Sequence, residues 1–239
     1  MFKIALNAGH YLKTAGKRCM KSLDKNETRE WVLNDRICDK IETMLKEYDG
    51  YKLLRVDDTT GATDVSLTNR CKKANSFGAN FYLSIHHNAG VNGGKGGGVV
   101  AYVYTKVDDT TKAWQKELYN AIISKTGLKG NRSTPLASAN LQEVRQTTMP
   151  AVLLECGFMD SATDVPIILT EDFANKVAAA CVEVIVKRGK LTKKQPAPVP
   201  ETTTGTIYRV QVGAYNDKAN AEKLVASLKK DGYAAYITT

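Results

Sequence analysis

Short apolar runs alternate with segments of helical periodicity over residues 1–190, and this alternation constrains the fold more than any other feature. The apolar runs are rich in β-branched or aromatic residues and are bounded by turn residues, which predicts strands at Phe2–Leu6, Lys52–Val56, Phe81–Ile85, Gly98–Tyr104 and Ala151–Leu154. Apolar residues at helical spacing predict helices at Glu30–Tyr48, Thr68–Ser76, Asp109–Lys125 and Glu171–Lys187. The order predicts an α/β domain with a mixed, mostly parallel sheet and helices on both faces.

A change in composition ends this domain. Residues 191–205 carry proline at alternate positions from Pro196 to Pro200, followed by a run of threonines, and such a segment is typical of an extended linker. The remaining residues, 206–239, predict a small β-α-β segment with a helix cap at Asn216 and Asp217 and a turn at Gly232. A segment this short cannot bury a stable core alone, so we expect it to pair with something or to be incomplete here.

The charge balance narrows the classes of partner. Lys and Arg number 34 against 25 Asp and Glu, which gives a formal net charge of +9 and favours polyanions such as nucleic acid or a bacterial wall polymer. The basic residues are scattered rather than clustered on one helix with interleaved aromatics, which argues against nucleic acid. No apolar stretch reaches the roughly 18 residues of a transmembrane helix. We therefore expect no membrane partner.

The expected compartment follows from the N-terminus and the cysteines. The first residues lack the apolar core and cleavage site of a signal peptide, so we expect synthesis in a cytoplasm without one. The five cysteines are an odd number at wide spacings without a Cys-x-x-Cys pair. This pattern predicts buried thiols in a reducing compartment rather than a disulfide framework.

Few residues in the predicted domain are suited to catalysis. The chain has only three histidines, and two of them, His10 and His86, follow or end predicted strands. A carboxylate, Glu155, ends a third apolar run, and a buried charge is costly unless it is paired or used. The carboxyl ends of parallel strands meet at one edge of a sheet, so these three side chains can converge.

Two imidazoles and a carboxylate make a catalytic zinc set with one position open for water, and a second carboxylate is then needed as general base. Two further carboxylates, Glu27 and Glu30, stand near the start of the first predicted helix. Both also suit a purely structural role, because acidic residues complement the dipole of a helix first turn, and Glu27 fits a capping position. The residues alone leave this choice open.

Four motifs occur in the order found in one enzyme family. They are Gly9–His10, the Glu-x-x-x-Asn of Glu30–Asn34, the Ser-Ile-His-x-Asn of Ser84–Asn88 and the Pro-Ala-Val-Leu-Leu-Glu-Cys-Gly-Phe of Pro150–Phe158. Together they resemble the zinc-dependent N-acetylmuramoyl-L-alanine amidases of the Amidase_3 family over residues 1 to 188. The resemblance implies Zn2+ bound by His10, Glu30 and His86, with Glu155 as the catalytic carboxylate.

The same resemblance implies the substrate. It is peptidoglycan, cleaved at the amide between the lactyl group of N-acetylmuramic acid and L-alanine. Without a signal peptide, a phage endolysin or an autolysin that reaches the bacterial wall after release fits this activity. Asn88 and Arg145 resemble family positions near the site, which suggests contact with substrate, although Arg145 could equally pair with a surface carboxylate.

Two positions depart from the family pattern. Tyr11 stands where a glycine often follows the Gly-His pair, and His87 stands where a small residue is usual. Strand alternation points His87 away from His86, so we expect it to pack outside the ligand set; exchange of the two histidines is the alternative. Glu27 remains the alternative to Glu30.

The C-terminal segment resembles the first half of a SPOR repeat, on the residues Tyr208–Tyr215, the following helix and Gly232–Tyr233. The resemblance implies binding to cell wall glycan, and two copies could complete each other as a homodimer. Two other readings stay open for the whole chain: a zinc peptidase on the same scaffold, and a non-catalytic wall-binding protein. The glycine run 93–98 lacks the Gly-Lys-Ser/Thr ending of a phosphate loop, and no Gly-x-Ser-x-Gly elbow of a serine hydrolase is present.

Overall fold

The structure is a computed structural model that describes residues 1–90, 94–195 and 210–238. It divides the chain into two units, Met1–Lys193 and Lys194–Thr239. The predicted linker falls partly outside the described residues, and Thr192 and Lys193 at its start still pair within the first unit.

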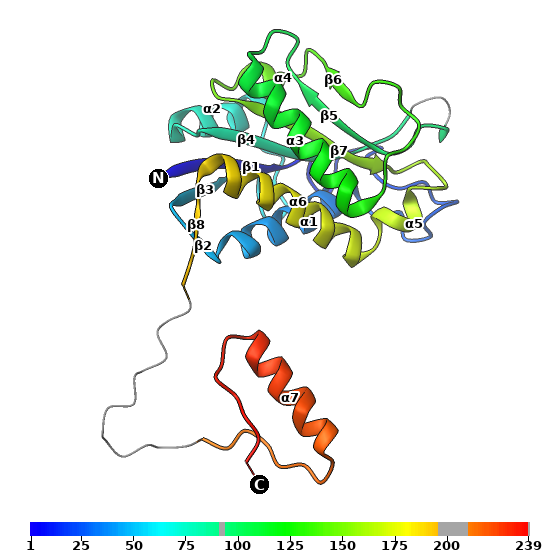
Figure 1. Ribbon diagram of the computed structural model, residues 1–239. Coiled ribbons are helices and arrows are strands. Elements are labelled where there is room, and N and C mark those ends of the chain that lie inside the picture. The colour runs from blue at the N-terminus through cyan, green and yellow to red at the C-terminus, as the bar shows by residue number, and fades with distance from the viewer. Residues whose placement is uncertain (91–93, 196–209, 239) are drawn as a thin grey trace. The chain divides into compact units, whose positions relative to one another are not determined.

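A six-stranded sheet in the order β3-β1-β4-β7-β5-β6 forms the centre of the first unit (Figure 1). Its strands are β1 (Phe2–Ala8), β3 (Tyr51–Arg55), β4 (Phe81–Asn88), β5 (Val99–Val103), β6 (Leu136–Ser138) and β7 (Ala151–Phe158). β3, β1, β4 and β7 run parallel, β5 is antiparallel to β7, and β6 is parallel to β5. The prediction of a mixed, mostly parallel sheet is confirmed.

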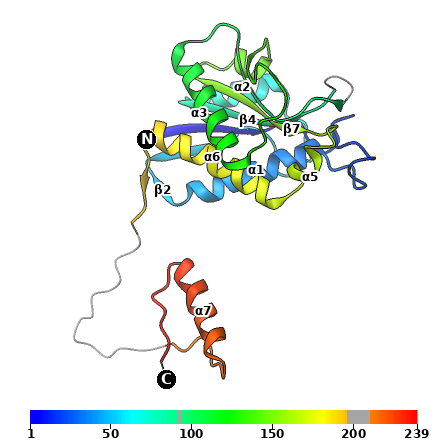
Figure 2. The same cartoon turned by 45° about the vertical axis from the view of Figure 1, so that its right-hand side comes forward.

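Helices cover both faces of this sheet, as predicted. The larger core lies under three long helices, α1 (Glu30–Leu45), α3 (Asp109–Thr126) and α6 (Glu171–Gly189), and Figure 2 shows α1 and α6 side by side. The smaller core, on the opposite face, lies under α2 (Leu67–Phe77) and α4 (Gln142–Arg145). The remaining elements are α5 (Val165–Ile168) and a two-stranded sheet of β2 (Tyr48–Asp49) and β8 (Thr192–Lys193).

Strand alternation sorts the residues between the two cores. In β1, Ile4 and Leu6 belong to the larger core, whereas Ala5 belongs to the smaller one. All five cysteines are buried free thiols, which confirms the predicted burial. Among the described residues no helix has the length and apolar character needed to cross a membrane.

The described residues of the second unit contain one helix, α7 (Lys218–Lys230), which begins where the sequence predicts it. Asp217 caps it by accepting a hydrogen bond from the backbone N–H of Ala219 at 2.8 Å. The two strands predicted to flank this helix are wrong for the described residues, because 210–217 and 231–238 form no strand. The alternating pattern gives a strand only where a partner strand completes its hydrogen bonds, and residues 210–238 form no such ladder.

Candidate active site

Three parallel strands bring the predicted site residues to one edge of the sheet. β1 pairs with β4 so that Ala8 lies opposite Ile85, and β4 pairs with β7 so that His86 lies opposite Glu155. His10 lies two residues after the end of β1, with Gly9 between them. Because neighbouring strands are about 4.8 Å apart, this register places the side chains of His86 and Glu155 beside each other on one face.

Glu30, the first residue of α1, completes the cluster. Its Oε2 atom lies 3.3 Å from Nε2 of His10, and its Oε1 atom lies 3.1 Å from Nδ1 of His86. The two imidazole rings meet edge to face with their centroids 5.1 Å apart. The ligand atoms of the three residues all lie within 4.8 Å of one another, close enough to share one metal ion.

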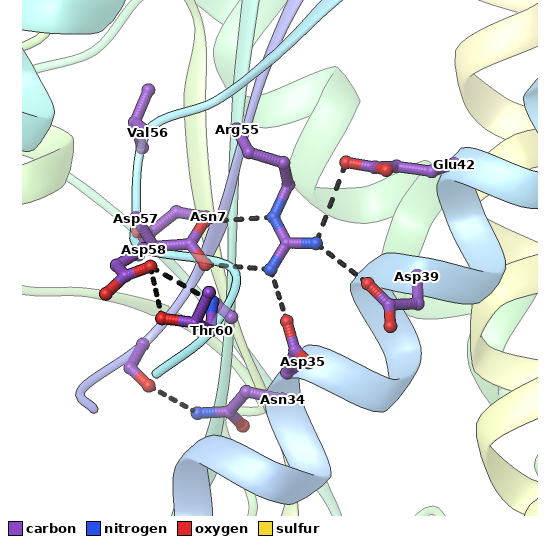
Figure 3. Close-up of polar contacts among 12 residues, drawn as sticks. Asn7, Asn34, Asp35, Asp39, Glu42, Arg55, Val56, Asp57, Asp58 and Thr60 are labelled. Atoms are coloured by element: carbon purple, nitrogen blue, oxygen red, sulfur yellow. Dashed lines mark hydrogen bonds and ion pairs between the residues drawn. The ribbon is translucent and has the colours of Figure 1, made fainter. Parts of the chain in front are cut away.

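The backbone around His10 is clamped from two sides. His10 has a φ of +66°, an uncommon conformation for a residue other than glycine. The buried Arg70 guanidinium donates to the carbonyl of His10 at 2.7 Å. The side-chain amide of Asn34, which Figure 3 labels, donates to the carbonyl of Gly9 at 3.1 Å. A side chain at Gly9 would come within 2.1 Å of the His86 ring, so only glycine allows the two histidines to approach.

A charged cluster ties α1 to the sheet and so fixes the position of Glu30. Figure 3 shows the guanidinium of Arg55, at the end of β3, among carboxylates from α1 and from the loop after β3. These carboxylates are Asp35, Asp39, Glu42 and Asp57. Burial raises the pKa of Asp35 to about 6 despite its contact with Arg55, so Asp35 takes up a proton as the pH falls below that value.

The electrostatics of the cluster favour a cation. Burial opposes charge on Glu30, but its hydrogen bond with His86 and the nearby histidines hold the pKa of Glu30 at about 2. Burial likewise opposes charge on His86, but Glu143 and Glu30 on either side raise the pKa of that imidazole to about 10. Burial lowers the pKa of His10 to about 4. An ionised carboxylate and a neutral imidazole therefore face the same small space.

Glu155 differs from the other carboxylates. It is partly exposed, yet its Oε2 atom is shielded from solvent and accepts no hydrogen bond from the described residues. Burial raises its pKa to about 7, and the charge of Glu30 adds to the rise while His86 opposes it. A carboxyl group that titrates near neutral pH is suited to take up and return a proton.

Two residues weighed as alternative ligands lie outside the cluster. The side chain of His87 points to the other side of β4, where its Nδ1 atom lies 2.8 Å from Oδ1 of Asn34. Its backbone N–H donates to Oε1 of Glu30 at 3.1 Å, so His87 supports Glu30 through the main chain. Glu27 pairs instead with Arg18 at 2.9 Å.

The structure places one of the two residues predicted to contact substrate, Asn88, beside the cluster. Asn88 ends β4 beside the cluster, and its side-chain oxygen accepts the backbone N–H of Ala89 at 2.8 Å. Arg145 is exposed at the end of α4 and donates to Asn140 at 2.6 Å. A role of either in substrate contact stays a prediction.

The sequence matches the Amidase_3 family, described as N-acetylmuramoyl-L-alanine amidase, over residues 4–187. The chain belongs to this family. The matched region of the amidase includes every residue of the cluster, from His10 to Glu155. A second match, to the SPOR domain, covers residues 188–239.

Curated relatives agree with this assignment. The amidase is 30% identical over 240 residues to the sporulation-specific N-acetylmuramoyl-L-alanine amidase of Bacillus subtilis, covering 99% of this chain and 84% of that protein. It is 31% identical over 198 residues to the endolysin of Bacillus phage SPP1, covering 82% of this chain and 69% of that protein.

Solved structures agree as well. The catalytic domain of the N-acetylmuramoyl-L-alanine amidase CwlV from Bacillus (Paenibacillus) polymyxa var. colistinus matches with a TM-score of 0.68 at 26% identity, covering 79% of this chain and 98% of that one. An N-acetylmuramoyl-L-alanine amidase from Clostridium difficile 630 has the same fold, with a TM-score of 0.69 at 24% identity, covering 78% of this chain and 95% of that one.

Sequence reasoning missed a buried polar network on the α2–α4 side of the amidase sheet. Its members are Asn7, Arg70, Tyr82, Ser84 and Glu143, all buried. Two members gave a signal: Asn7 is a polar residue that directly follows an apolar run, and Ser84 belongs to the Ser-Ile-His-x-Asn motif. Arg70, Tyr82 and Glu143 lie on α2, β4 and α4, and only the folded chain brings them into contact with Asn7 and Ser84.

Proposed function

We propose that this amidase hydrolyses the amide between the lactyl group of N-acetylmuramic acid and L-alanine in peptidoglycan, with zinc held by His10, Glu30 and His86. The observation that carries the proposal is the convergence of these three side chains within 4.8 Å, with Glu155 opposite His86 in the strand register. Family membership supports the substrate, and the donor set supports the metal.

The donor chemistry fits zinc. Two imidazoles and one carboxylate are a known catalytic zinc set, and Oε2 of Glu30 is buried without a hydrogen-bond partner among the described residues. Lys17, half exposed, lies 3.7 Å from the same oxygen and supplies part of the positive charge that this carboxylate requires. When bound, zinc would polarise the scissile carbonyl and lower the pKa of a water molecule toward neutrality.

Glu155 is the proposed general base and acid. It takes one proton from the attacking water, whose oxygen forms a bond to the lactyl carbonyl carbon. The bond from that carbon to the L-alanine nitrogen then breaks, and Glu155 returns the proton to the leaving nitrogen. The products are a lactyl carboxylic acid and a free amine, and at neutral pH the proton of the acid passes to the amine. With a pKa near 7, Glu155 can both accept a proton and donate it at neutral pH.

The C-terminal unit is the proposed wall-binding part. Its match to the SPOR domain supports binding to cell wall glycan, and its described residues expose large apolar side chains suited to contact with a partner. These side chains are Val210, Val212, Tyr215, Tyr233, Tyr236 and Ile237. Pairing of two copies through this unit stays a prediction, which the molar mass in solution would test.

The relatives named as a sporulation-specific amidase and as an endolysin suggest two biological settings for the same reaction. We propose that the chain acts on the cell wall, as an endolysin or an autolysin. Comparing lysis of intact cells from outside with lysis after membrane permeabilisation would distinguish a phage-type role, which requires the second condition, from a role at the outer surface.

The decisive experiment combines metal content with product analysis on purified peptidoglycan. About one zinc per chain, new amino termini of L-alanine and no new reducing sugar would establish the reaction. Zinc with other new amino termini would indicate a peptidase on the same scaffold. Absence of both zinc and cleavage would leave a wall-binding protein and refute the proposal.

A further inference from the structure

The two ring nitrogens of His86 face different carboxylates. Nδ1 lies 3.1 Å from Oε1 of Glu30, on the side of the metal cluster. Nε2 lies 3.4 Å from Oε2 of Glu143, on the side of α4, and this ion-pair contact is longer than an ordinary hydrogen bond. Nε2 is buried and has no other partner among the described residues. The ring therefore lies between the metal cluster and a second buried carboxylate.

The other oxygen of Glu143 is fixed by two donors. Oε1 accepts the hydroxyl of Tyr82 at 2.6 Å and the side-chain amide of Asn7 at 2.8 Å. The orientation of that amide is set by Arg70, which can only donate and contacts Oδ1 of Asn7 at 2.6 Å. The NH2 group of Asn7 must therefore face Glu143, and Glu143 is held as an acceptor.

We propose that Glu143 is a positioning residue for the metal centre, which accepts the Nε2–H of His86, so that Nδ1, facing His10 and Glu30, is the nitrogen that gives up its proton when the metal binds. This inference rests on the proposed metal site. A neutral imidazole carries its proton on one nitrogen only, and the hydrogen bond made by the other nitrogen selects which. A carboxylate behind a ligating histidine also orients the ring and increases its basicity.

An amide cannot replace Glu143. In Glu143→Gln, the amide oxygen can face either His86 or the pair Tyr82 and Asn7, but not both. If the oxygen remains with Tyr82 and Asn7, the NH2 group faces Nε2 of His86 and favours the tautomer with its proton on Nδ1, where the metal would bind. If the amide turns over, its NH2 group meets the NH2 group of Asn7. The first arrangement opposes metal binding, and the second keeps the required tautomer only at the cost of placing two donors against each other, even though the size of the side chain is unchanged.

The test measures zinc affinity by competition with a chromophoric chelator, in the full-length chain. Wild type establishes the site by binding one zinc. We expect Glu143→Gln to bind zinc about 10–100-fold more weakly than wild type. Glu143→Asp keeps the charge but shortens the side chain, and we expect zinc affinity between those of wild type and the Gln variant. Tyr82→Phe is the matched control, because it removes one partner of Glu143 and keeps the carboxylate.

The melting temperature of the metal-free protein separates positioning from general stability. A positioning role predicts that Tyr82→Phe lowers this temperature while zinc affinity stays near wild type, and that both Glu143 variants lose zinc affinity beyond any change in metal-free stability. Wild-type zinc affinity in folded Glu143→Gln and Glu143→Asp would overturn the inference and leave the metal site intact. Absence of zinc in wild type would instead refute the proposed metal site itself.

Discussion

Replacing Glu155 by Gln should stabilise the metal-free amidase at alkaline pH. The pKa of Glu155 rises from 4.5 to about 7 in the folded chain, so the folded state binds its proton more tightly than the unfolded state does. Below pH 4.5 the group is protonated in both states and carries no penalty. Between pH 4.5 and 7 the penalty grows, and above pH 7 it is constant, because the carboxylate is then charged in both states.

The size of this penalty follows from the pKa difference. Each pKa unit corresponds to about 1.4 kcal/mol, so the full shift of Glu155 corresponds to about 3 kcal/mol. Gln carries no charge at any of these pH values and avoids the penalty. The advantage of Glu155→Gln over wild type should therefore be about 2–3 kcal/mol greater at pH 8 than at pH 5.

Urea unfolding of both proteins, at pH 5 and pH 8 with a chelator present, measures this difference. Glu27→Gln is the control, since Glu27 forms only a surface ion pair with Arg18 and should change the free energy of unfolding by no more than about 1 kcal/mol. The same Glu155→Gln protein should retain zinc but lose hydrolysis by about 10²–10⁴-fold. A difference from wild type that is the same at both pH values would refute the reasoning.

Three further outcomes are expected. Glu30→Ala should abolish zinc retention while Glu27→Ala leaves it unchanged, and elemental analysis after gel filtration would show a reversed order if the ligand were Glu27. Arg70→Met should lower the free energy of unfolding by about 3–5 kcal/mol, because three backbone carbonyls and the side chain of Asn7 lose a buried charged donor; chemical denaturation showing a loss of less than about 1 kcal/mol would mean that the contact of Arg70 with His10 is dispensable. Deletion of residues 194–239 should keep hydrolysis of soluble muropeptides and reduce co-sedimentation with whole walls, and an inactive truncation would make the C-terminal unit part of the catalytic fold.

Local pattern was enough to predict most of the catalytic unit. Apolar runs and helical spacing located five strands of the main sheet and its long helices. Each of these elements buries one or both faces, and the buried residues recur at a regular spacing along the local sequence. The edge strand β6 was missed, since its three residues, Leu136–Ser138, are too short to show a period. The prediction of strands on either side of α7 was wrong for the opposite reason. The alternating pattern is present in the sequence, but residues 210–238 form no hydrogen-bonded ladder.

The sequence by itself determined the residue types and the strand ends of the candidate site. His10, His86 and Glu155 each follow or end an apolar run, and parallel strands must bring such ends to one edge. Only the tertiary structure showed that Glu30 lies beside His86 whereas Glu27 pairs with Arg18 outside the cluster, because these contacts depend on how the start of α1 packs against β4. The tertiary structure also brought Glu143 into contact with Nε2 of His86, and Arg70 into contact with the carbonyl of His10. These contacts join residues separated by 57 and 60 positions, and no local period encodes them.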